Sequence, residues 1–183
     1  GTTWNRTAKL LAWDGSDFDG FGSALALVNN TLIVGAFLDD DKGEDSGSAY
    51  IFVRNNGVWS QQAKLTPSPG KADELFGFSV ALGTDIAVVG AIEGMDSSAG
   101  RGAAYIFIRT NGVWTQSARL TAADGSNGDQ FGFSVAVQGN MVSVGAPNHQ
   151  GTGATYLYLS SGSGWQQAGK LPWNGNRQVL SAG

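Results

Sequence analysis

The sequence predicts an all-β fold of β-propeller-type blades, each with four antiparallel strands: three repeats of about 55 residues plus an extra N-terminal outer strand. The first observation behind this prediction is an internal period, because several residues recur at a spacing of 55: Trp4, Trp59 and Trp114; Phe21-Gly22, Phe76-Gly77 and Phe131-Gly132; Gly35-Ala36, Gly90-Ala91 and Gly145-Ala146. The second is that hydrophobic residues alternate with small ones inside each repeat, whereas no segment has a helical period.

The second repeat illustrates the four strands in order. Residues 76–82 alternate bulky and small side chains, which predicts the first strand. The apolar run at 86–90 predicts a strand buried on both faces, and residues 104–109 predict a third. Residues 114–120 are more polar, so we place this fourth strand at the outer edge. Asn111-Gly112 before it is a strong hairpin signal.

This pattern organises the whole chain as one partial propeller domain over residues 1–183. The predicted blades cover about 12–65, 66–120 and 121–171, with an orphan outer strand at 1–11 and a degenerate tail at 172–183. Propellers typically have at least four blades, so three would leave two open sides. Two explanations stay open. Either the chain is a fragment of a longer repeat array, or it self-associates, for example as a dimer completing a ring of six or more blades.

Composition excludes several classes of protein. With 42% hydrophobic and only 14% charged residues, the chain is unlike a disordered one. A net charge of −4 disfavours nucleic-acid binding, and no apolar run is long enough for membrane insertion. Cysteine is absent, which excludes disulfides and thiolate metal sites.

The repeated motifs resemble the FG-GAP repeat, the blade unit of the integrin alpha-chain propeller. The similarity is strongest to its bacterial variant, through "FGFSVAL", "VVGA" and "GSAYIF" taken in order, and it extends over residues 4–171. The resemblance implies a propeller with an extracellular or cell-surface binding and adhesion role. It names no ligand, since a fold does not specify a function.

Calcium is the cofactor that this resemblance suggests, but the family's Asp-rich motif between the first two strands is missing. The corresponding hairpins, at residues 28–31, 83–85 and 138–140, are too short and too poor in carboxylates for an ion that takes six to eight oxygens. Two other acidic loops remain candidates for calcium. Their carboxylates are Asp39, Asp41, Glu44 and Asp45 in one loop and Asp14, Asp17 and Asp19 in the other.

Propeller connectivity sorts the charges by face. Loops joining strands 2 and 3 of a blade emerge together with those joining strand 4 to the next blade, and the hairpins emerge on the opposite face. All acidic residues except Asp85 lie in the first group, whereas the basic residues there are only Lys42, Lys71 and Arg101. We therefore expect an acidic loop face that attracts cations or a basic partner.

Aromatic residues offer an alternative function. The tryptophans that begin the outer strands are expected to pack between blades, but Trp13 and Trp173 fall in loops and could stack on sugars, as in a lectin. His149, the single histidine, is expected to be solvated in its loop, so no catalytic triad is foreseen. The sequence therefore favours a non-catalytic module that binds a protein or glycan. The remaining alternative is an accessory propeller of a larger surface protein or enzyme.

Overall fold

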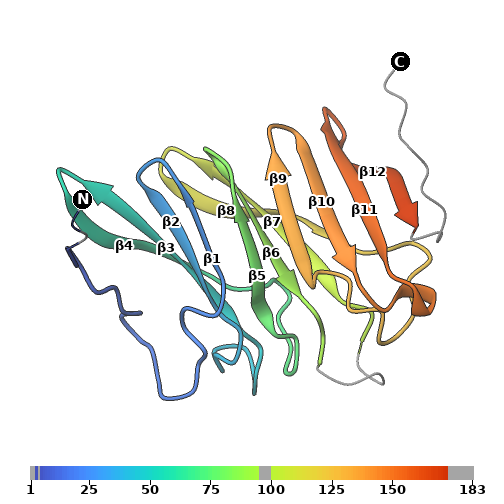
Figure 1. The fold of residues 1–183 in the computed structure, drawn as a ribbon, viewed down its shortest axis with the longest axis horizontal. Coiled ribbons are helices and arrows are strands. Elements are labelled where there is room, and N and C mark those ends of the chain that lie inside the picture. Colours follow the sequence, from blue (N-terminus) through green and yellow to red (C-terminus); the bar gives the residue numbers. More distant parts are fainter. Residues whose placement is uncertain (1–2, 4, 95–99, 173–183) are drawn as a thin grey trace.

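The computed structural model describes residues 3, 5–94 and 100–172 of the chain, and these form three four-stranded antiparallel sheets (Figure 1). The strands of the first blade are β1 (Leu25–Val28), β2 (Thr31–Ala36), β3 (Ser48–Asn55) and β4 (Val58–Leu65). Those of the second are β5 (Phe76–Leu82), β6 (Ile86–Ala91), β7 (Ala103–Thr110) and β8 (Val113–Leu120). Those of the third are β9 (Ser134–Gln138), β10 (Met141–Ala146), β11 (Ala154–Ser161) and β12 (Gly164–Pro172).

Each sheet is a simple meander, with its strands hydrogen-bonded in chain order. The outer hairpins form where the Asn-Gly pairs predicted them. Asn56 and Gly57 have φ of 49° and 85°, and Asn111 and Gly112 have φ of 51° and 81°, so both pairs adopt the left-handed backbone that a tight hairpin requires. The one helical element in the described chain is η1 (His149–Gly151), a short turn between β10 and β11. The all-β prediction is therefore confirmed.

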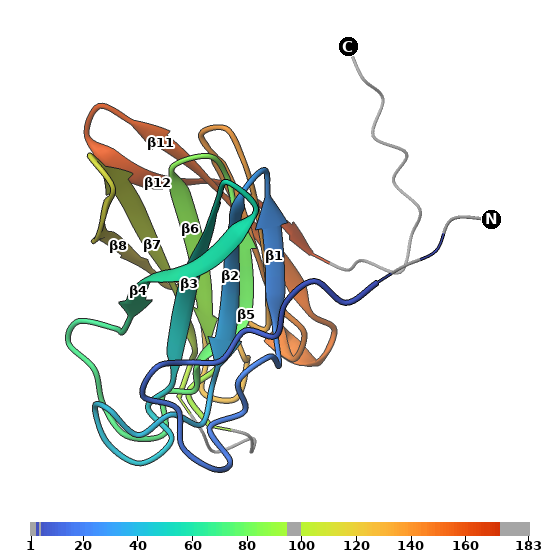
Figure 2. The same ribbon diagram turned by 90° about the vertical axis from the view of Figure 1, so that its left-hand side faces the viewer.

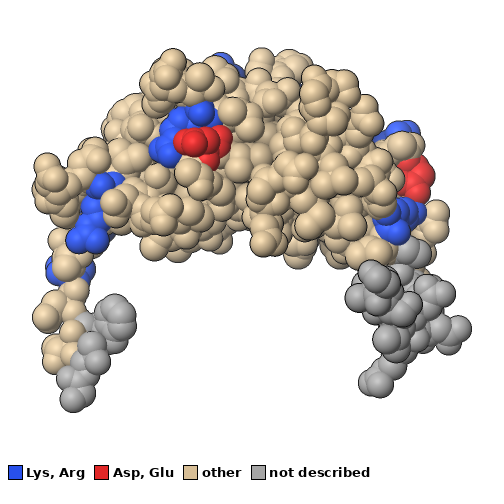
Figure 3. Space-filling view, turned by 90° about the horizontal axis from the view of Figure 1, so that it is seen from above, with Lys and Arg blue, Asp and Glu red and all other residues tan. Residues whose placement is uncertain are grey.

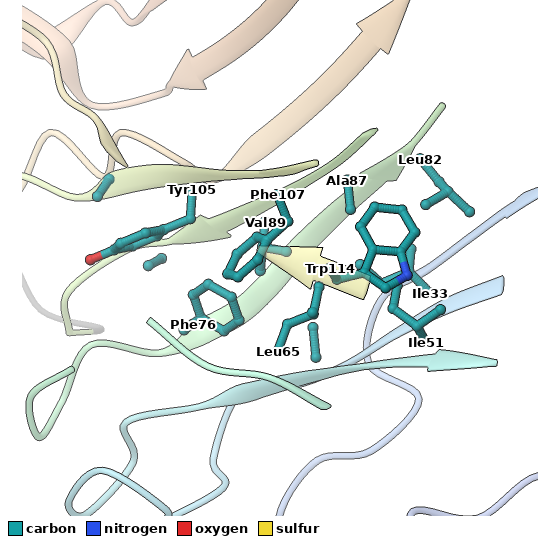
Figure 4. Close-up of a cluster of buried hydrophobic side chains, with 13 residues drawn as sticks. Ile33, Ile51, Leu65, Phe76, Leu82, Ala87, Val89, Tyr105, Phe107 and Trp114 are labelled. Atoms are coloured by element: carbon teal, nitrogen blue, oxygen red, sulfur yellow. The ribbon is translucent and has the colours of Figure 1, made fainter. Parts of the chain in front are cut away.

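The blades pack face to face, and each sheet has two different faces. The face toward the following blade is aliphatic, with Ile33, Ile51 and Leu65 in the first blade. The face toward the preceding blade is aromatic, with Phe76, Tyr105, Phe107 and Trp114 in the second. Figure 4 shows these side chains meeting in one buried cluster, with Trp114 beside Ile51. Burial of such large apolar side chains is the main force that holds neighbouring blades together.

A close backbone contact fixes the spacing between blades. Gly77 of the second blade lies so near the first that a Cβ on it would overlap the carbonyl oxygen of Ser48. A Cβ on Gly35 would in turn overlap the carbonyl oxygen of Gly77. Gly132 repeats this contact one blade later, against the carbonyl of Ala103. The glycines of the Phe-Gly and Gly-Ala motifs therefore recur because adjacent sheets touch at these positions.

The predicted N-terminal outer strand is not formed, since residues 5–11 have no strand pairing. A strand needs a hydrogen-bonding neighbour, and β3 already pairs with the first blade's own outer strand, β4. Instead, the segment crosses the otherwise open aromatic face of the first blade (Figure 2), where Leu10 and Ala12 pack against Val34, Tyr50 and Phe52. The predicted tail lies outside the described residues, apart from Pro172 at the end of β12.

The glycine contact yields a matched pair of variants. Gly77→Ala should lower the free energy of unfolding by about 3 kcal/mol, because a strained left-handed backbone and a steric overlap act together. Gly22 has nearly the same φ, 96° against 95°, but open space around its Cβ position, so Gly22→Ala should cost only about 1 kcal/mol for the backbone. Urea denaturation at a protein concentration low enough to keep the chain monomeric measures both, and equal losses would contradict the contact.

Candidate site on the loop face

The described carboxylates lie where connectivity predicted. The acidic residues of the described chain lie in the β2–β3 and β6–β7 loops, before β1 and between blades, except Asp85 in the β5–β6 hairpin. The view onto the hairpin side accordingly shows few acidic side chains (Figure 3). At the loop end of each blade, however, these carboxylates form an organised cluster with a tyrosine and a base.

In the first blade the cluster is centred on Lys64, at the end of β4. Its Nζ lies 2.9 Å from Asp14 Oδ2, 2.9 Å from Asp39 Oδ2 and 2.6 Å from Asp41 Oδ2. The hydroxyl of Tyr50 lies 2.8 Å from Asp39 Oδ2 and 3.0 Å from Asp14 Oδ1, and Ser48 Oγ donates to Asp39 Oδ1. A single ammonium thus pairs with three carboxylates from two segments of the chain, the loop before β1 and the β2–β3 loop.

The second blade replaces lysine by arginine and aspartate by glutamate. Tyr105 donates a hydrogen bond to Glu74, which is 1% exposed, and Arg119 Nε donates to the Tyr105 hydroxyl over 3.0 Å. The other end of the Arg119 guanidinium reaches Glu93 Oε1 at 2.6 Å, and Lys71 Nζ lies 3.3 Å from the same oxygen. This cluster again joins the tyrosine of its blade to a base near the end of the outer strand and to loop carboxylates, but its carboxylates come from other repeat positions than Asp14 and Asp39.

The third blade adds a histidine. Lys170 Nζ lies 2.6 Å from Asp124 Oδ2 and 2.7 Å from His149 Nε2, and the Tyr156 hydroxyl donates to Asp124 Oδ1 at 2.8 Å. His149 Nδ1 lies 2.7 Å from Asp129 Oδ2. Since Lys170 is a donor, His149 accepts at Nε2 and donates from Nδ1. His149 is only 2% exposed, so the expectation of a solvated histidine is wrong.

Burial and hydrogen bonding shift the pKa values of these groups in different directions. Burial alone would raise the pKa of Asp39, but hydrogen bonds from Lys64 and Tyr50 outweigh it and lower that pKa. Hydrogen bonds from Lys170 and Tyr156 lower the pKa of Asp124 to about 2. At Glu74 burial dominates, so its pKa is raised despite the bond from Tyr105. Burial also raises the pKa of all three cluster tyrosines.

A second repeated feature organises the loops between blades. Asp19, Glu74 and Asp129 occupy equivalent positions, and each accepts a hydrogen bond from the amide three residues earlier, at 2.6, 3.2 and 2.8 Å. Their own backbone carbonyls accept from the amides of Leu38, Glu93 and Asn148 in the β2–β3, β6–β7 and β10–β11 loops. These acids therefore fold the loop and tie it to its neighbour.

This geometry changes the interpretation of the predicted calcium ligands. Asp14, Asp39 and Asp41 do converge, but on the Lys64 ammonium, and Asp19 is committed to its own turn. Asp17 and Glu44 are exposed, and Asp45 is half-buried. Within the ranges that the structure describes, no three Asp, Glu or His side chains are placed to hold a metal ion. Asp14, Asp39 and Asp41 therefore do not fit a calcium site, because the Lys64 ammonium occupies the point on which they converge, whereas calcium binding by the other predicted ligands stays a prediction.

The predicted charge of the loop face also needs correction. Lys64, Arg119 and Lys170 lie at this face as well, so the expectation that Lys42, Lys71 and Arg101 are its only basic residues is wrong. Lys64, Arg119 and Lys170 occupy equivalent positions in the repeat. So do the three tyrosines of the clusters, so the repeated pairing of a tyrosine with a base was a signal for the clusters in the sequence. Only the pairing of different loops shows that these bases turn toward the acids.

What the clusters leave exposed is a mixed acidic and aromatic surface before the first blade. Trp13 is 65% exposed and Phe18 is 91% exposed, on either side of the exposed Asp17. The backbone amide of Trp13 donates to Gln61 Oε1 at 3.1 Å, which fixes the chain beside the ring. Trp114 and Trp165 pack between blades as expected, Trp59 packs in the cluster that Leu10 and Ala12 cover on the first blade, and Trp4 and Trp173 lie outside the described residues.

The three-blade architecture and its repeated Phe-Gly contacts define a class of propeller-like repeat proteins. A family profile described as "FG-GAP repeat" matches residues 4–52, 59–107 and 114–158. The chain therefore belongs to the FG-GAP repeat family, as its motifs predicted. Each match begins at the outer-strand motif, so a sequence repeat contains the end of one blade and the first three strands of the next. A comparison with curated proteins finds no match.

The first-blade cluster predicts that loss of Lys64 reverses the pH dependence of the protein's stability. Asp39 has a lowered pKa, so it contributes stability that is present above its unfolded pKa and lost as the pH falls through the folded value. Lys64→Met should lower the free energy of unfolding by about 3 kcal/mol at pH 7, because the buried carboxylate of Asp39 loses its charged partner. The pKa of Asp39 would then be raised, so acidification to pH 5 should stabilise this variant. Urea unfolding at several pH values measures the effect, with the exposed Lys42→Met as control.

Calcium should leave the thermal stability of the native protein unchanged. The lysine ammonium already occupies the point on which Asp14, Asp39 and Asp41 converge, so chelator and saturating calcium should give the same melting temperature. A rise of several degrees with calcium would contradict this reading and restore the predicted site. Magnesium at equal ionic strength is the control for general salt effects.

Proposed function

We propose that the protein is a non-catalytic binding and adhesion module of an extracellular or cell-surface protein, and that it binds its partner across the loop face. FG-GAP repeats are typical of extracellular and surface proteins. No helix in the described part of the chain has the length and apolarity needed to cross a bilayer. The observation that carries the proposal is that Trp13, Asp17 and Phe18, within six residues of one loop, are all exposed.

This surface has the chemistry of a recognition site. Large aromatic side chains contribute most of the binding energy at many protein interfaces, provided that they are free to be buried by the partner. Carboxylates without an internal counter-ion steer basic partners toward them. Among the ion pairs of the described residues, Asp17, Asp40, Glu44 and Asp73 take no part. A partner with basic and apolar side chains fits this combination.

A non-catalytic role is supported by where the perturbed acids point. Glu74 and Asp39 are buried, and both are hydrogen-bonded to tyrosines within their own blade. Asp129 and His149 are likewise buried against one another. A general acid or base must reach substrate, and these groups are taken up by the fold.

A basic probe peptide tests the proposed surface. A peptide of alternating arginine and leucine should bind the native protein, and the triple variant Asp17→Asn, Asp40→Asn, Glu44→Gln should bind it about tenfold more weakly, with a smaller salt dependence. Asp85→Asn, on the opposite face, is the matched control and should bind as the native protein does. Equal weakening by the control would refute binding across the loop face.

Repeating the peptide titration with a calcium chelator tests calcium assistance, which would have to act through Asp17, Glu44 and Asp45.

A lectin is the second candidate function, because the exposed ring of Trp13 could stack on a sugar. In that case simple sugars should change the tryptophan fluorescence of the native protein, and Trp13→Ala should abolish the change. Trp59→Phe, which alters a ring packed in the first blade, is the control. The protein-partner proposal instead expects no fluorescence response to sugars.

A further inference from the structure

Both blade interfaces are made by the same device, in which a Phe-Gly pair of one blade enters a socket on the preceding blade. In the first interface the amide of Phe76 donates to the carbonyl of Ser46 over 3.0 Å. In the second the amide of Phe131 donates to the carbonyl of Arg101 over 3.1 Å. The socket walls are glycines, because a Cβ on Gly47 or Gly102 would overlap the incoming phenylalanine backbone.

The third blade carries the same socket without an occupant. Gly145 and Gly153 are equivalent to the socket glycines of the first two blades, and Gly153 keeps the left-handed φ of 83°. The amide of the blade's own Gly132 donates to the carbonyl of Gly145 over 3.1 Å, but among the described residues no Phe-Gly pair of another blade lies against Gly145 or Gly153. The structure has instead an open depression of about 520 Å³, lined by residues that include Phe133, Ser134, Gly145, Gly153, Thr155 and Leu171.

Ser134 indicates that this depression is built for a backbone. In the second blade Ser79 Oγ lies over Gly90 and donates a 2.7 Å hydrogen bond to the carbonyl of Gly132 in the occupant. Ser134 Oγ holds the same position over Gly145. Its hydroxyl is therefore placed to donate to the carbonyl of an incoming glycine.

A Phe-Gly pair that matches this socket, called the plug below, lies at the other end of the same chain, at Phe21-Gly22. Phe21 contacts Tyr50 and Phe52 as Phe76 and Phe131 contact the aromatic rings of their own blades, with centroids 5.5 and 6.1 Å apart. Gly22 has the plug conformation, φ 96°, with open space around its Cβ position. Leu25 and Leu27 continue this aromatic-type face and are 63% and 60% exposed.

The two end faces are complementary in the same way as the buried interfaces. Residues on the open face of the third blade are equivalent to interface residues of the second, Ile86, Ile108 and Leu120. They remain apolar but are 40 to 48% exposed: Met141, Leu159 and Leu171. Exposed apolar faces of this kind mark interaction surfaces.

We propose that the open socket on β9–β12 binds the Phe21-Gly22 plug of a second copy of this chain, head to tail. The amide of Phe21 would donate to the carbonyl of Thr152, which is equivalent to Ser46 and Arg101. The first and third blades lie at opposite ends of the described body (Figure 1), so each of two chains would offer its plug to the socket of the other, and two such contacts would close a ring. The proposal is independent of ligand binding on the loop face.

The sequence of residues 173–183 contains no phenylalanine, and hence no further Phe-Gly pair. The N-terminal segment covers the plug's own blade. Leu10 is equivalent to Leu65, Leu120 and Leu171, and it packs where the outer strand of a preceding blade would lie. A docking chain must replace it with its own Leu171, so this segment acts as a removable cover.

A pair of complementary variants tests the contact by sedimentation. Thr155→Arg blocks the socket, because the equivalent Ala104 is fully buried between blades. Leu25→Arg blocks the plug. The native protein should show concentration-dependent association, and either variant should raise the dissociation constant at least about 100-fold. Mixed together, the two variants should form a one-to-one complex, since one intact plug meets one intact socket.

Several outcomes would overturn the proposal. These are a native protein that stays monomeric at the highest soluble concentration, association that neither variant weakens, and a mixture that fails to associate. Thr110→Arg, at an exposed strand end, is the matched control and should associate as the native protein does. Circular dichroism of each variant establishes that it is folded, and an unfolded Thr155 variant would be replaced by Thr155→Gln.

The cover is tested by two neighbouring leucines. Leu10 packs on the first blade, whereas Leu11 is 64% exposed. Leu10→Asp should lower the dissociation constant about tenfold, because the cover is released, and Leu11→Asp should leave it unchanged. Equal effects of the two variants would contradict the claim that the N-terminal segment is displaced when a second chain docks. Loss of association on deleting residues 173–183 would overturn the assignment of the plug to Phe21-Gly22.

Discussion

The contact between a Phe-Gly pair and the glycines of the preceding blade is the constraint on which the rest of the structure depends. It brings backbone against backbone, and no side chain larger than hydrogen is accommodated at Gly35, Gly77 or Gly90. Because adjacent sheets meet at this point, the apolar faces above it close over aromatic and aliphatic side chains. The loops below it then come near enough to exchange hydrogen bonds between blades.

The tyrosine clusters follow from this spacing. Tyr50, Tyr105 and Tyr156 are all fully buried, and each needs a partner for its hydroxyl at the loop end of the blade. Carboxylates from the preceding loops supply that partner, and the last residues of the outer strands supply the compensating charge. The acidic residues that look like a surface feature in the sequence are thus partly internal, and the outward-facing acidic surface is smaller than the sequence suggests.

The strands and the family were predictable, because they depend on local alternation, hairpin residues and a repeat that the chain displays three times. The ion clusters were not, since Lys64 lies 50 residues after Asp14 and 25 after Asp39, and only the folded loops unite them. The prediction of an N-terminal strand was wrong for a related reason. Its residues match the outer-strand motif, but pairing depends on a neighbour that β4 excludes.

One difference among the clusters has a consequence for folding. The first and third blades pair lysine with aspartate, whereas the second pairs arginine with glutamate. Nearly identical repeats are prone to exchange strands during folding, because a foreign outer strand would satisfy the same hydrogen bonds and bury the same apolar side chains. A β8 strand in the place of β4 would bring the long arginine against Asp14, Asp39 and Asp41, where a compact ammonium fits. The alternation of side-chain length along the array thus disfavours the exchange of outer strands between adjacent blades.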